Sequence, residues 1–183
     1  MGSYSYGKNE VCAWIREHFP AERSTILDVG ACDGNWLHRL PEYMAMDAVE
    51  AFRPNVKNLW GYRQVFCTDI RDFEFEHYDL IIFGDVIEHL SVEDAQKVLA
   101  YAVPRCRDLV IAVPFLYEQD ALYGNPWEVH LQPDLTAALF ADRYPGFEVL
   151  CDPGHDYCYY HKGPQMAEIP QPAAPAAPFE KGA

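Results

Sequence analysis

Apolar residues follow two alternating patterns along the sequence, short continuous runs and runs with helical spacing. Continuous apolar runs are typical of parallel strands buried on both faces, whereas helical spacing is typical of amphipathic helices. The continuous runs predict strands at residues 24–29, 43–49, 64–67, 78–84 and 109–113. Helical spacing predicts helices at residues 9–19, 36–40, 54–59, 92–103 and 134–144.

The alternation of strands and helices predicts a single α/β domain over residues 1–163, with a mostly parallel sheet. Two further short strands, at 147–150 and 157–160, are separated by turn-forming residues and predict an antiparallel hairpin. Residues 164–183 are rich in proline and alanine, so we expect a flexible tail without chemistry of its own.

The charge balance is strongly acidic, because 14 Lys and Arg residues stand against 28 Asp and Glu residues, a net charge of −14. Such a charge repels a phosphate backbone and an anionic membrane surface, so we expect neither nucleic acid nor membrane as a partner. The six cysteines are scattered, and no apolar run is long enough to cross a bilayer. These features predict a reduced, soluble, cytoplasmic protein and leave its oligomeric state open.

The stretch 26–36 carries a functional signal, because an apolar run ends at Gly30 and Gly34 and then continues into a predicted helix. Strand, tight turn and helix in this order direct backbone N–H groups and the positive end of a helix dipole into a crevice. Glycine also lets a ligand approach the backbone closely. We therefore predict a cofactor site at this turn, with simple packing as the alternative.

Acidic residues occur at the ends of the next two predicted strands. Glu50 ends the second strand, about 20 residues after the first glycine, where doubly wound folds bind the two ribose hydroxyls of a nucleotide. Asp47 competes for this role but lies within the strand. The alternative for Glu50 is a solvated carboxylate at a strand end, without a ligand. Asp69 ends the third strand and precedes Ile70; this pair predicts an adenine site unless Asp69 only begins a turn.

Polar residues also follow the fourth predicted strand, namely Asp85, Glu88 and His89 after Gly84. This pattern predicts an active-site edge. The long segment 115–132 contains a second histidine, His130. Histidine suits a general base because its ordinary pKa is near neutrality, so His130 is the first candidate base and His89 the second. A structural role is the alternative for both.

In their order along the chain, these motifs resemble those of the class I S-adenosylmethionine-dependent methyltransferases. Residues 28–34 (DVGACDG) are similar to the family's Asp-x-Gly-x-Gly-x-Gly loop, and residues 84–90 (GDVIEHL) are similar to the stretch after strand four in its small-molecule branch. The resemblance extends from about residue 24 to residue 160. It implies a Rossmann-like, doubly wound sheet of seven strands, mostly parallel with an antiparallel last strand, and helices on both faces.

The resemblance also implies methyl transfer from S-adenosylmethionine to a small-molecule acceptor, with O-methylation favoured over N-methylation. Asp28 would orient the cofactor's amino group, and Asp85 would lie beside its sulfonium. Cys32 occupies the position of the family's middle glycine, so its side chain would have to turn away from the methionine moiety. The cofactor residues that the resemblance implies are Asp28, Gly30, Ala31, Gly34, Glu50, Asp69, Ile70 and Asp85.

Methyl transfer is an in-line displacement, so such an enzyme mainly aligns donor and acceptor and removes a proton. His130 or His89 would remove that proton, and Trp127 and Glu128 would shape the acceptor pocket. The product would be S-adenosylhomocysteine.

Several alternatives compete with this interpretation. A nucleic-acid amino-methyltransferase would need an Asn/Asp-Pro-Pro-aromatic motif after strand four, and a nicotinamide dehydrogenase would need Gly-x-Gly-x-x-Gly; the sequence contains neither. A domain that binds the cofactor without catalysis and acts as an interaction module remains open. A zinc site at the predicted hairpin is a further alternative, with Cys151, His155, Cys158 and His161 as its ligands. Alternating side chains of a hairpin point to opposite faces, so these four would not converge on one ion, and we predict no metal site.

Overall fold

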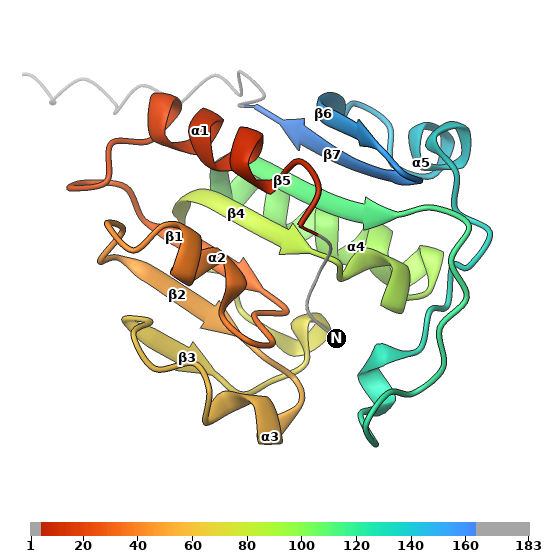
Figure 1. Ribbon diagram of the computed structural model, residues 1–183, viewed down its shortest axis with the longest axis horizontal. Coiled ribbons are helices and arrows are strands. Elements are labelled where there is room, and N and C mark those ends of the chain that lie inside the picture. The colour runs from red at the N-terminus through yellow and green to blue at the C-terminus, as the bar shows by residue number, and fades with distance from the viewer. Residues whose placement is uncertain (1–4, 164–183) are drawn as a thin grey trace, which may run out of the picture.

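The computed structural model describes residues 5–163 and contains a seven-stranded sheet with helices on both faces (Figure 1). The predicted tail at residues 164–183 lies outside the described part. The strands are β1 (Ile26–Val29), β2 (Met46–Val49), β3 (Gln64–Phe66), β4 (Tyr78–Gly84), β5 (Cys106–Pro114), β6 (Glu148–Gly154) and β7 (Tyr157–Lys162). The helices are α1 (Lys8–His18), α2 (Asn35–Arg39), α3 (Arg53–Val56), α4 (Val92–Ala102) and α5 (Ala137–Arg143).

The strands are arranged in the order β3-β2-β1-β4-β5-β7-β6. Strands β1 to β5 run parallel to one another, and β7 runs antiparallel between β5 and β6. The predicted doubly wound fold with an antiparallel last strand is therefore confirmed. The strand order reverses between β1 and β4, and an open α/β sheet forms a crevice for ligands at such a point, beyond the carboxyl ends of the strands.

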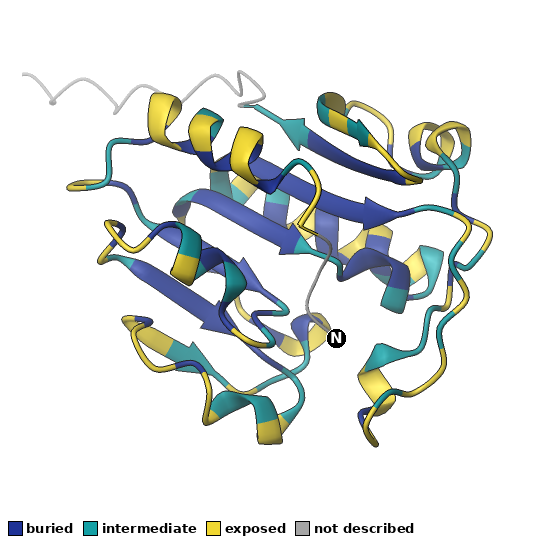
Figure 2. Ribbon diagram, viewed as in Figure 1, coloured by how far each residue is buried: buried dark blue, intermediate teal, exposed yellow. Residues whose placement is uncertain are grey.

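Strand β4 shows how the apolar runs of the sequence build two cores. Ile81 and Phe83 pack on one face of the sheet, in the cluster that includes the buried side of α4. Leu80 and Ile82 pack on the opposite face, in the cluster that includes α1 and α2. The central strands are consequently buried along most of their length, as Figure 2 shows in dark blue. A strand covered on both faces carries apolar residues on both faces, which is why residues 80–83 of β4 show no alternation.

Several boundaries differ from the prediction by a few residues, and the differences at β2 and β6 have clear physical reasons. Strand β2 starts at Met46 and not at residue 43, because Tyr43 belongs to the turn after α2, where its hydroxyl donates to the carbonyl of Phe19 at 2.7 Å. Strand β6 continues to Gly154, so that only His155 and Asp156 form the turn to β7. Both turn residues have positive φ, 61° and 53°, as a tight two-residue hairpin requires.

None of the helices in residues 5–163 has the length and apolarity that a membrane span requires. The segment between β5 and α5 is irregular apart from the short 3-10 helix Pro126–Glu128. In Figure 1 this segment extends away from the end of β5 toward the lower right, beyond the carboxyl ends of the parallel strands.

Candidate active site

A pocket lies at the carboxyl ends of the parallel strands, where the strand order reverses. Its walls come from the loop after β1, the end of β2, the residues after β3, the turn after β4 and the segment 117–130. Most of the predicted site residues line it, namely Gly30, Ala31, Glu50, Asp69, Ile70, Asp85, His89 and His130, together with Trp127 and Glu128. Asp28 and Gly34 do not line it.

The loop after β1 approaches the turn after β4 very closely. A Cβ atom added at Gly30 would lie 2.5 Å from Cγ2 of Val86, so only glycine fits at this position, where φ is +69°. Gly34 has a different task, because it begins α2 with a φ of 75°. The two glycines of the motif therefore act separately, one by permitting close approach and the other by starting a helix.

Four backbone N–H groups of this loop are occupied within the protein, whereas the sequence predicted N–H groups that point into the crevice. Those of Gly30 and Ala31 donate to the carbonyl of Val49 at 2.9 and 3.3 Å. Those of Cys32 and Gly34 donate to Glu50 Oε2 at 2.8 Å and to the carbonyl of Ala31 at 2.7 Å. The loop is thus bonded to the end of β2, and these four groups do not form a cradle for a phosphate.

Glu50 connects the two strand ends at the base of the pocket. Its Oε2 accepts the N–H of Cys32 at 2.8 Å, and its Oε1 accepts the N–H of Phe52 at 2.7 Å. Burial raises the pKa of this carboxyl, and the two N–H groups oppose that effect. Asp47 instead forms an ion pair with Arg63 and accepts the hydroxyl of Tyr78 at 3.0 Å, away from the pocket. Of the two carboxylates considered for a ribose, only Glu50 reaches the pocket.

Cys32 lies on the pocket wall with a φ of 49°, in the left-handed region. Its Sγ accepts a hydrogen bond from Nδ2 of Asn55 at 3.8 Å. Burial, followed by the nearby Asp33 carboxylate, raises the pKa of the thiol to about 11. The thiol is therefore protonated near neutral pH and unsuited to nucleophilic attack.

Asp69 and Ile70 lie together after β3, where Ile70 is buried. The carboxylate of Asp69 is bonded to Arg71, whose Nε lies 3.0 Å and whose Nη2 lies 2.5 Å from Oδ2. This carboxylate also accepts the backbone N–H of Arg71 at 2.9 Å and so begins the short 3-10 helix Ile70–Asp72. Asp69 therefore both begins a local turn and lines the pocket.

Asp28 is buried behind the loop and accepts the hydroxyl of Tyr62. Its other oxygen, Oδ1, has no hydrogen-bond partner in the described part of the chain. Burial raises the pKa of this carboxyl to about 7.

Lys8 is a pocket residue that the sequence analysis missed. It is the first residue of α1, is 0% exposed and lines the pocket. Its Nζ lies 3.4 Å from Oδ1 of Asn35 and 5.0 Å from the ring centroid of Trp36. Burial lowers its pKa, and the carboxylates of Asp85 and Asp28 oppose that effect. A lysine at a helix start is usually solvated, so only the tertiary fold reveals this buried cation.

The turn after β4 places Asp85 and Glu88 at the pocket. Asp85 has a φ of 56°, and its Oδ1 accepts the hydroxyl of Tyr157 at 2.5 Å. Glu88 lies in the 3-10 helix Ile87–His89 and is 1% exposed. Neither carboxylate oxygen of Glu88 has a hydrogen-bond partner within residues 5–163. Burial, followed by repulsion from Asp85, holds the pKa of Glu88 well above its usual range.

The two predicted catalytic histidines lie side by side, with ring centroids 4.6 Å apart. Nδ1 of His89 is 3.2 Å from the carbonyl oxygen of Val129, and Nδ1 of His130 is 2.7 Å from that of Tyr117. A carbonyl only accepts, so each Nδ1 carries the proton and each Nε2 carries the lone pair. Burial lowers the pKa of both rings, that of His89 to about 4 with a smaller contribution from His130. Both rings are therefore neutral near pH 7.

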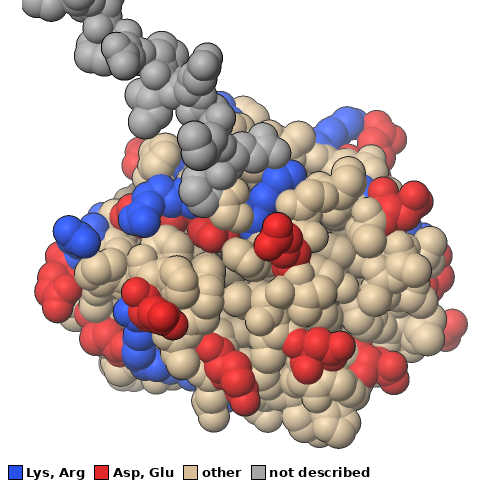
Figure 3. All heavy atoms as spheres, turned by 90° about the horizontal axis from the view of Figure 1, so that it is seen from above, with Lys and Arg blue, Asp and Glu red and all other residues tan. Residues whose placement is uncertain are grey.

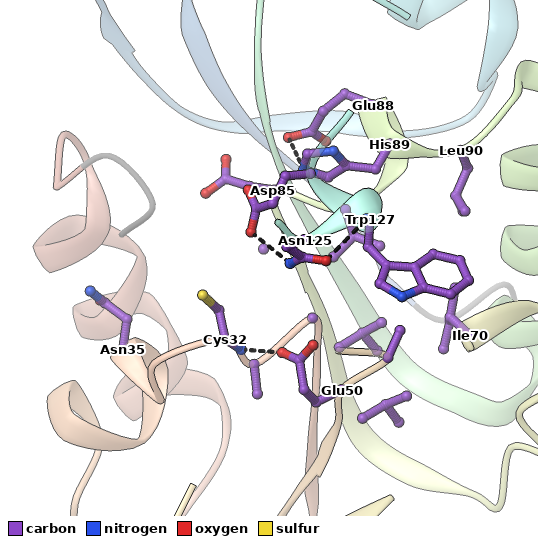
Figure 4. Close-up of a pocket in the computed structure, with 18 of the residues that line it drawn as sticks. Cys32, Asn35, Glu50, Ile70, Asp85, Glu88, His89, Leu90, Asn125 and Trp127 are labelled. Atoms are coloured by element: carbon purple, nitrogen blue, oxygen red, sulfur yellow. Dashed lines mark hydrogen bonds and ion pairs between the residues drawn. The ribbon is translucent and has the colours of Figure 1, made fainter. Parts of the chain in front are cut away.

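Figure 4 shows Asp85, Glu88 and His89 on one side of the pocket and Cys32 and Glu50 on the other, with Asn125 and Trp127 between them. Asn125 is a second residue that the sequence analysis missed. It is buried, and its Oδ1 accepts the N–H of Trp127 at 3.0 Å, which begins the 3-10 helix Pro126–Glu128. The Asn-Pro pair was a signal for this turn, but not for its place beside the pocket.

The four zinc ligands considered at the hairpin do not come together. His161 is bonded to Asp108 at 3.3 Å, and His155 stacks on Tyr6 with ring centroids 4.5 Å apart. Cys158 directs its Sγ to the carbonyl of Cys151 at 3.6 Å. Within residues 5–163, one group of three or more His, Cys, Asp or Glu side chains is close enough to hold a single ion, and it consists of Glu88, His89 and His130.

Comparison with solved structures shows the fold. An S-adenosylmethionine-dependent methyltransferase from Clostridium acetobutylicum ATCC 824 superposes with a TM-score of 0.66 at 12% identity, covering 88% of this chain and 93% of that one. Magnesium protoporphyrin IX methyltransferase from Synechocystis PCC 6803, with bound SAM, superposes with a TM-score of 0.59 at 13% identity, covering 84% of this chain and 76% of that one. The N-terminal domain of EvdMO1, with bound SAH, superposes with a TM-score of 0.59 at 15% identity, covering 87% of this chain and 80% of that one.

These identities are low, so the similarity establishes a shared architecture, the Rossmann-like fold of S-adenosylmethionine-dependent methyltransferases. No protein-family model matches the sequence, and a search of curated proteins finds no match.

Proposed function

We propose that this protein is an S-adenosylmethionine-dependent methyltransferase acting on a small-molecule acceptor, with O-methylation favoured over N-methylation. The observation that carries the proposal is a single pocket, which combines the Glu50 carboxylate with the neutral pair His89 and His130 on its opposite side. Cofactor and acceptor residues would thereby face one another, as an in-line transfer requires.

The polar groups of the pocket fit S-adenosylmethionine, which supplies a methyl group on a positively charged sulfur when bound. Glu50 would accept the ribose hydroxyls through the lone pairs that Cys32 and Phe52 leave available. Asp69 and Ile70 would bind the adenine edge and face. The occupied N–H groups of the loop after β1 favour this phosphate-free cofactor over a dinucleotide.

Lys8 would bind the carboxylate of the cofactor's amino-acid end. Its ammonium is buried in the pocket wall, and a buried cation is costly unless an anion compensates it. Asp28 lies behind the loop, so it would reach the cofactor's amino group through water, with Gly34 shaping the loop from outside the pocket. Gly30 and Ala31 would line the methionine moiety, and Asp85 would lie on the sulfonium side.

On the acceptor side, the lone pair on Nε2 of His130 would accept the proton of the acceptor's hydroxyl group. The ring suits this role because its Nδ1–H is held by the carbonyl of Tyr117 and because the ring is neutral near pH 7. His89 is the second candidate, and Trp127 and Glu128 would shape the acceptor space.

Charge supports a small molecule rather than a nucleic acid. The net charge is −14, and on the face in Figure 3 acidic side chains are scattered among basic and uncharged ones. All six cysteines are free, which supports a reducing compartment, and we propose the cytoplasm.

The direct test is release of S-adenosylhomocysteine with matched panels of hydroxyl and amine acceptors. We expect turnover with at least one hydroxyl compound. Turnover with amines alone would reject the preference for O-methylation. Tight binding of S-adenosylhomocysteine without turnover on either panel would favour the alternative, a cofactor-binding interaction module.

A further inference from the structure

The carboxylate of Glu88 has no compensating group in the described part of the chain. Its two oxygens are buried and accept no hydrogen bond, and Nε2 of the neutral His89 ring is 4.0 Å from Oε1. An uncompensated buried carboxylate is costly, and natural proteins commonly pair such a group or use it to coordinate a metal. Because Glu88 lines the pocket, a ligand there could provide the compensation.

The histidines next to Glu88 are oriented as metal ligands usually are. Both bond a backbone carbonyl through Nδ1, which leaves the lone pair on Nε2. In metal sites, a ligating histidine almost always donates its second ring N–H in this way, because that bond sets the tautomer and the ring orientation. Two histidines with this arrangement lie side by side and next to a carboxylate without a hydrogen-bond partner, so the three side chains form a set of potential metal ligands.

We propose that Glu88, His89 and His130 bind a divalent transition-metal ion. Their ligand atoms all lie within 4.8 Å of one another. An ion holds nitrogen and oxygen ligands at about 2.1 Å, so neighbouring ligand atoms would approach to about 3 Å, and side-chain shifts of roughly 1 Å would close the site. The expectation of no metal site, drawn from the sequence, would then be wrong for these residues.

The donor set narrows the choice of ion. Two imidazoles and one carboxylate suit zinc, iron and manganese in their divalent states, whereas magnesium and calcium prefer oxygen ligands alone. Three protein ligands also leave coordination positions open, as in catalytic rather than structural sites. The open positions would face the pocket that Glu88, His89 and His130 line.

The ion would give the acceptor a specific chemistry, and this part rests on the proposed methyl transfer. A hydroxyl oxygen of the acceptor would coordinate the ion, which lowers the pKa of that hydroxyl. The O–H bond would break with the proton passing to water, and the electron pair left on oxygen would form the new bond to the methyl carbon. The bond between that carbon and sulfur would break, with its electron pair remaining on sulfur. His130 would then be a ligand and not the base.

The test begins with metal binding to the full chain after treatment with a chelator. We expect Co²⁺ to bind with one equivalent per chain and to produce visible d–d absorption bands, and we expect Zn²⁺ to displace it. Glu88→Gln, which keeps the shape of the side chain, should weaken Co²⁺ binding by at least about 100-fold. His18→Gln is the matched control, because His18 lies exposed at the end of α1 and should bind Co²⁺ as the natural chain does.

Thermal unfolding checks that the variant folds. Metal-free Glu88→Gln should melt no lower than the metal-free natural chain, because it loses only an uncompensated carboxyl. Saturating Zn²⁺ should raise the melting temperature of the natural chain but not that of the variant. Failure of Co²⁺, Zn²⁺ and Mn²⁺ to bind at 1 mM, or equal binding by Glu88→Gln, would overturn the proposed metal site.

The two proposals fail separately. Calorimetry with S-adenosylhomocysteine, done on the same metal-free protein, reports the cofactor site alone. Cofactor binding and turnover that persist in excess chelator would reject the metal site and leave methyl transfer with His130 as base. Stoichiometric Co²⁺ binding without any cofactor binding would support the metal site and reject the methyltransferase.

Discussion

Oε2 of Glu50 accepts the backbone N–H of Cys32 at 2.8 Å, so the carboxylate at the end of β2 holds the loop after β1 in place. This bond joins the two sequence features on which a nucleoside site depends, the glycine loop and the acidic strand end. It also explains how a non-glycine residue keeps a φ of 49°, because the surrounding structure stabilises the loop. Glu50 therefore has a structural task in addition to its proposed contact with the ribose.

Glu50→Ala should lower the affinity for S-adenosylhomocysteine and the stability together. Loss of contacts to the ribose should weaken binding by at least about tenfold, and two N–H groups without an acceptor should cost about 1–3 kcal/mol of unfolding free energy. Calorimetry and urea denaturation measure the two effects. Asp47→Asn is the control, since it disrupts the ion pair with Arg63 away from the pocket and should lower stability only. Unchanged affinity in Glu50→Ala would remove Glu50 from the cofactor site.

Lys8→Met should weaken the binding of S-adenosylhomocysteine without lowering the stability of the protein. Methionine keeps an apolar side chain of similar length but cannot pair with a carboxylate, so affinity for S-adenosylhomocysteine should fall about 10- to 100-fold. The melting temperature should not fall, because the change removes a buried cation whose pKa is already lowered by burial. A variant that binds as tightly as the natural chain would show that Lys8 only packs against Trp36.

His130→Ala should lower turnover far more than it lowers cofactor affinity. Loss of the group that assists proton removal should reduce kcat by about 100-fold or more, while the Kd for S-adenosylhomocysteine changes by less than about threefold. Single-turnover assays and calorimetry on one preparation make the comparison. His18→Ala, remote from the pocket, should change neither value. Equal turnover in His130→Ala would assign a structural role to this histidine.

The sequence predicted the order of the elements because burial on both faces requires continuous apolar runs, as β4 and β5 show. It also indicated the strand ends that meet at the pocket, since parallel strands bring their carboxyl ends to one edge. Interactions across the fold were not predictable in this way. Lys8 contacts Asn35 from 27 positions away, and neither local periodicity nor composition indicates such a partner.

The hydrogen-bond partners of the glycine loop were likewise not predictable from the sequence, although Glu50 lies only 18 positions from Cys32. The motif predicted a turn, and a turn is present, but the destinations of its N–H groups depend on β2. Val49 and Glu50 accept three of these groups, so the loop is bonded to the sheet instead of presenting them to the crevice. Likewise, His89 and His130 were singled out separately, whereas their closeness to each other and to Glu88 came only from the fold.

Asp28 should make the stability of the protein depend on pH. The folded chain keeps the proton of Asp28 up to about pH 7, whereas the ordinary pKa of this group is 3.8. Between these values the folded state binds more protons than the unfolded state, so the contribution of Asp28 is fully present below pH 4 and is lost as pH rises through 7. The shift corresponds to an upper limit of about 4 kcal/mol.

The variant Asp28→Asn isolates this contribution from those of the other buried carboxyls, because asparagine does not titrate. Urea denaturation of both proteins from pH 4 to pH 8 gives the difference in unfolding free energy at each pH. That difference should shift steadily against the natural chain as pH rises, while the absolute level depends on how the new amide replaces the bond from Tyr62. A difference that stays constant with pH would mean that Asp28 is already ionised at pH 4 in the folded protein. The group would then need a charge partner or a water that compensates its buried oxygen Oδ1.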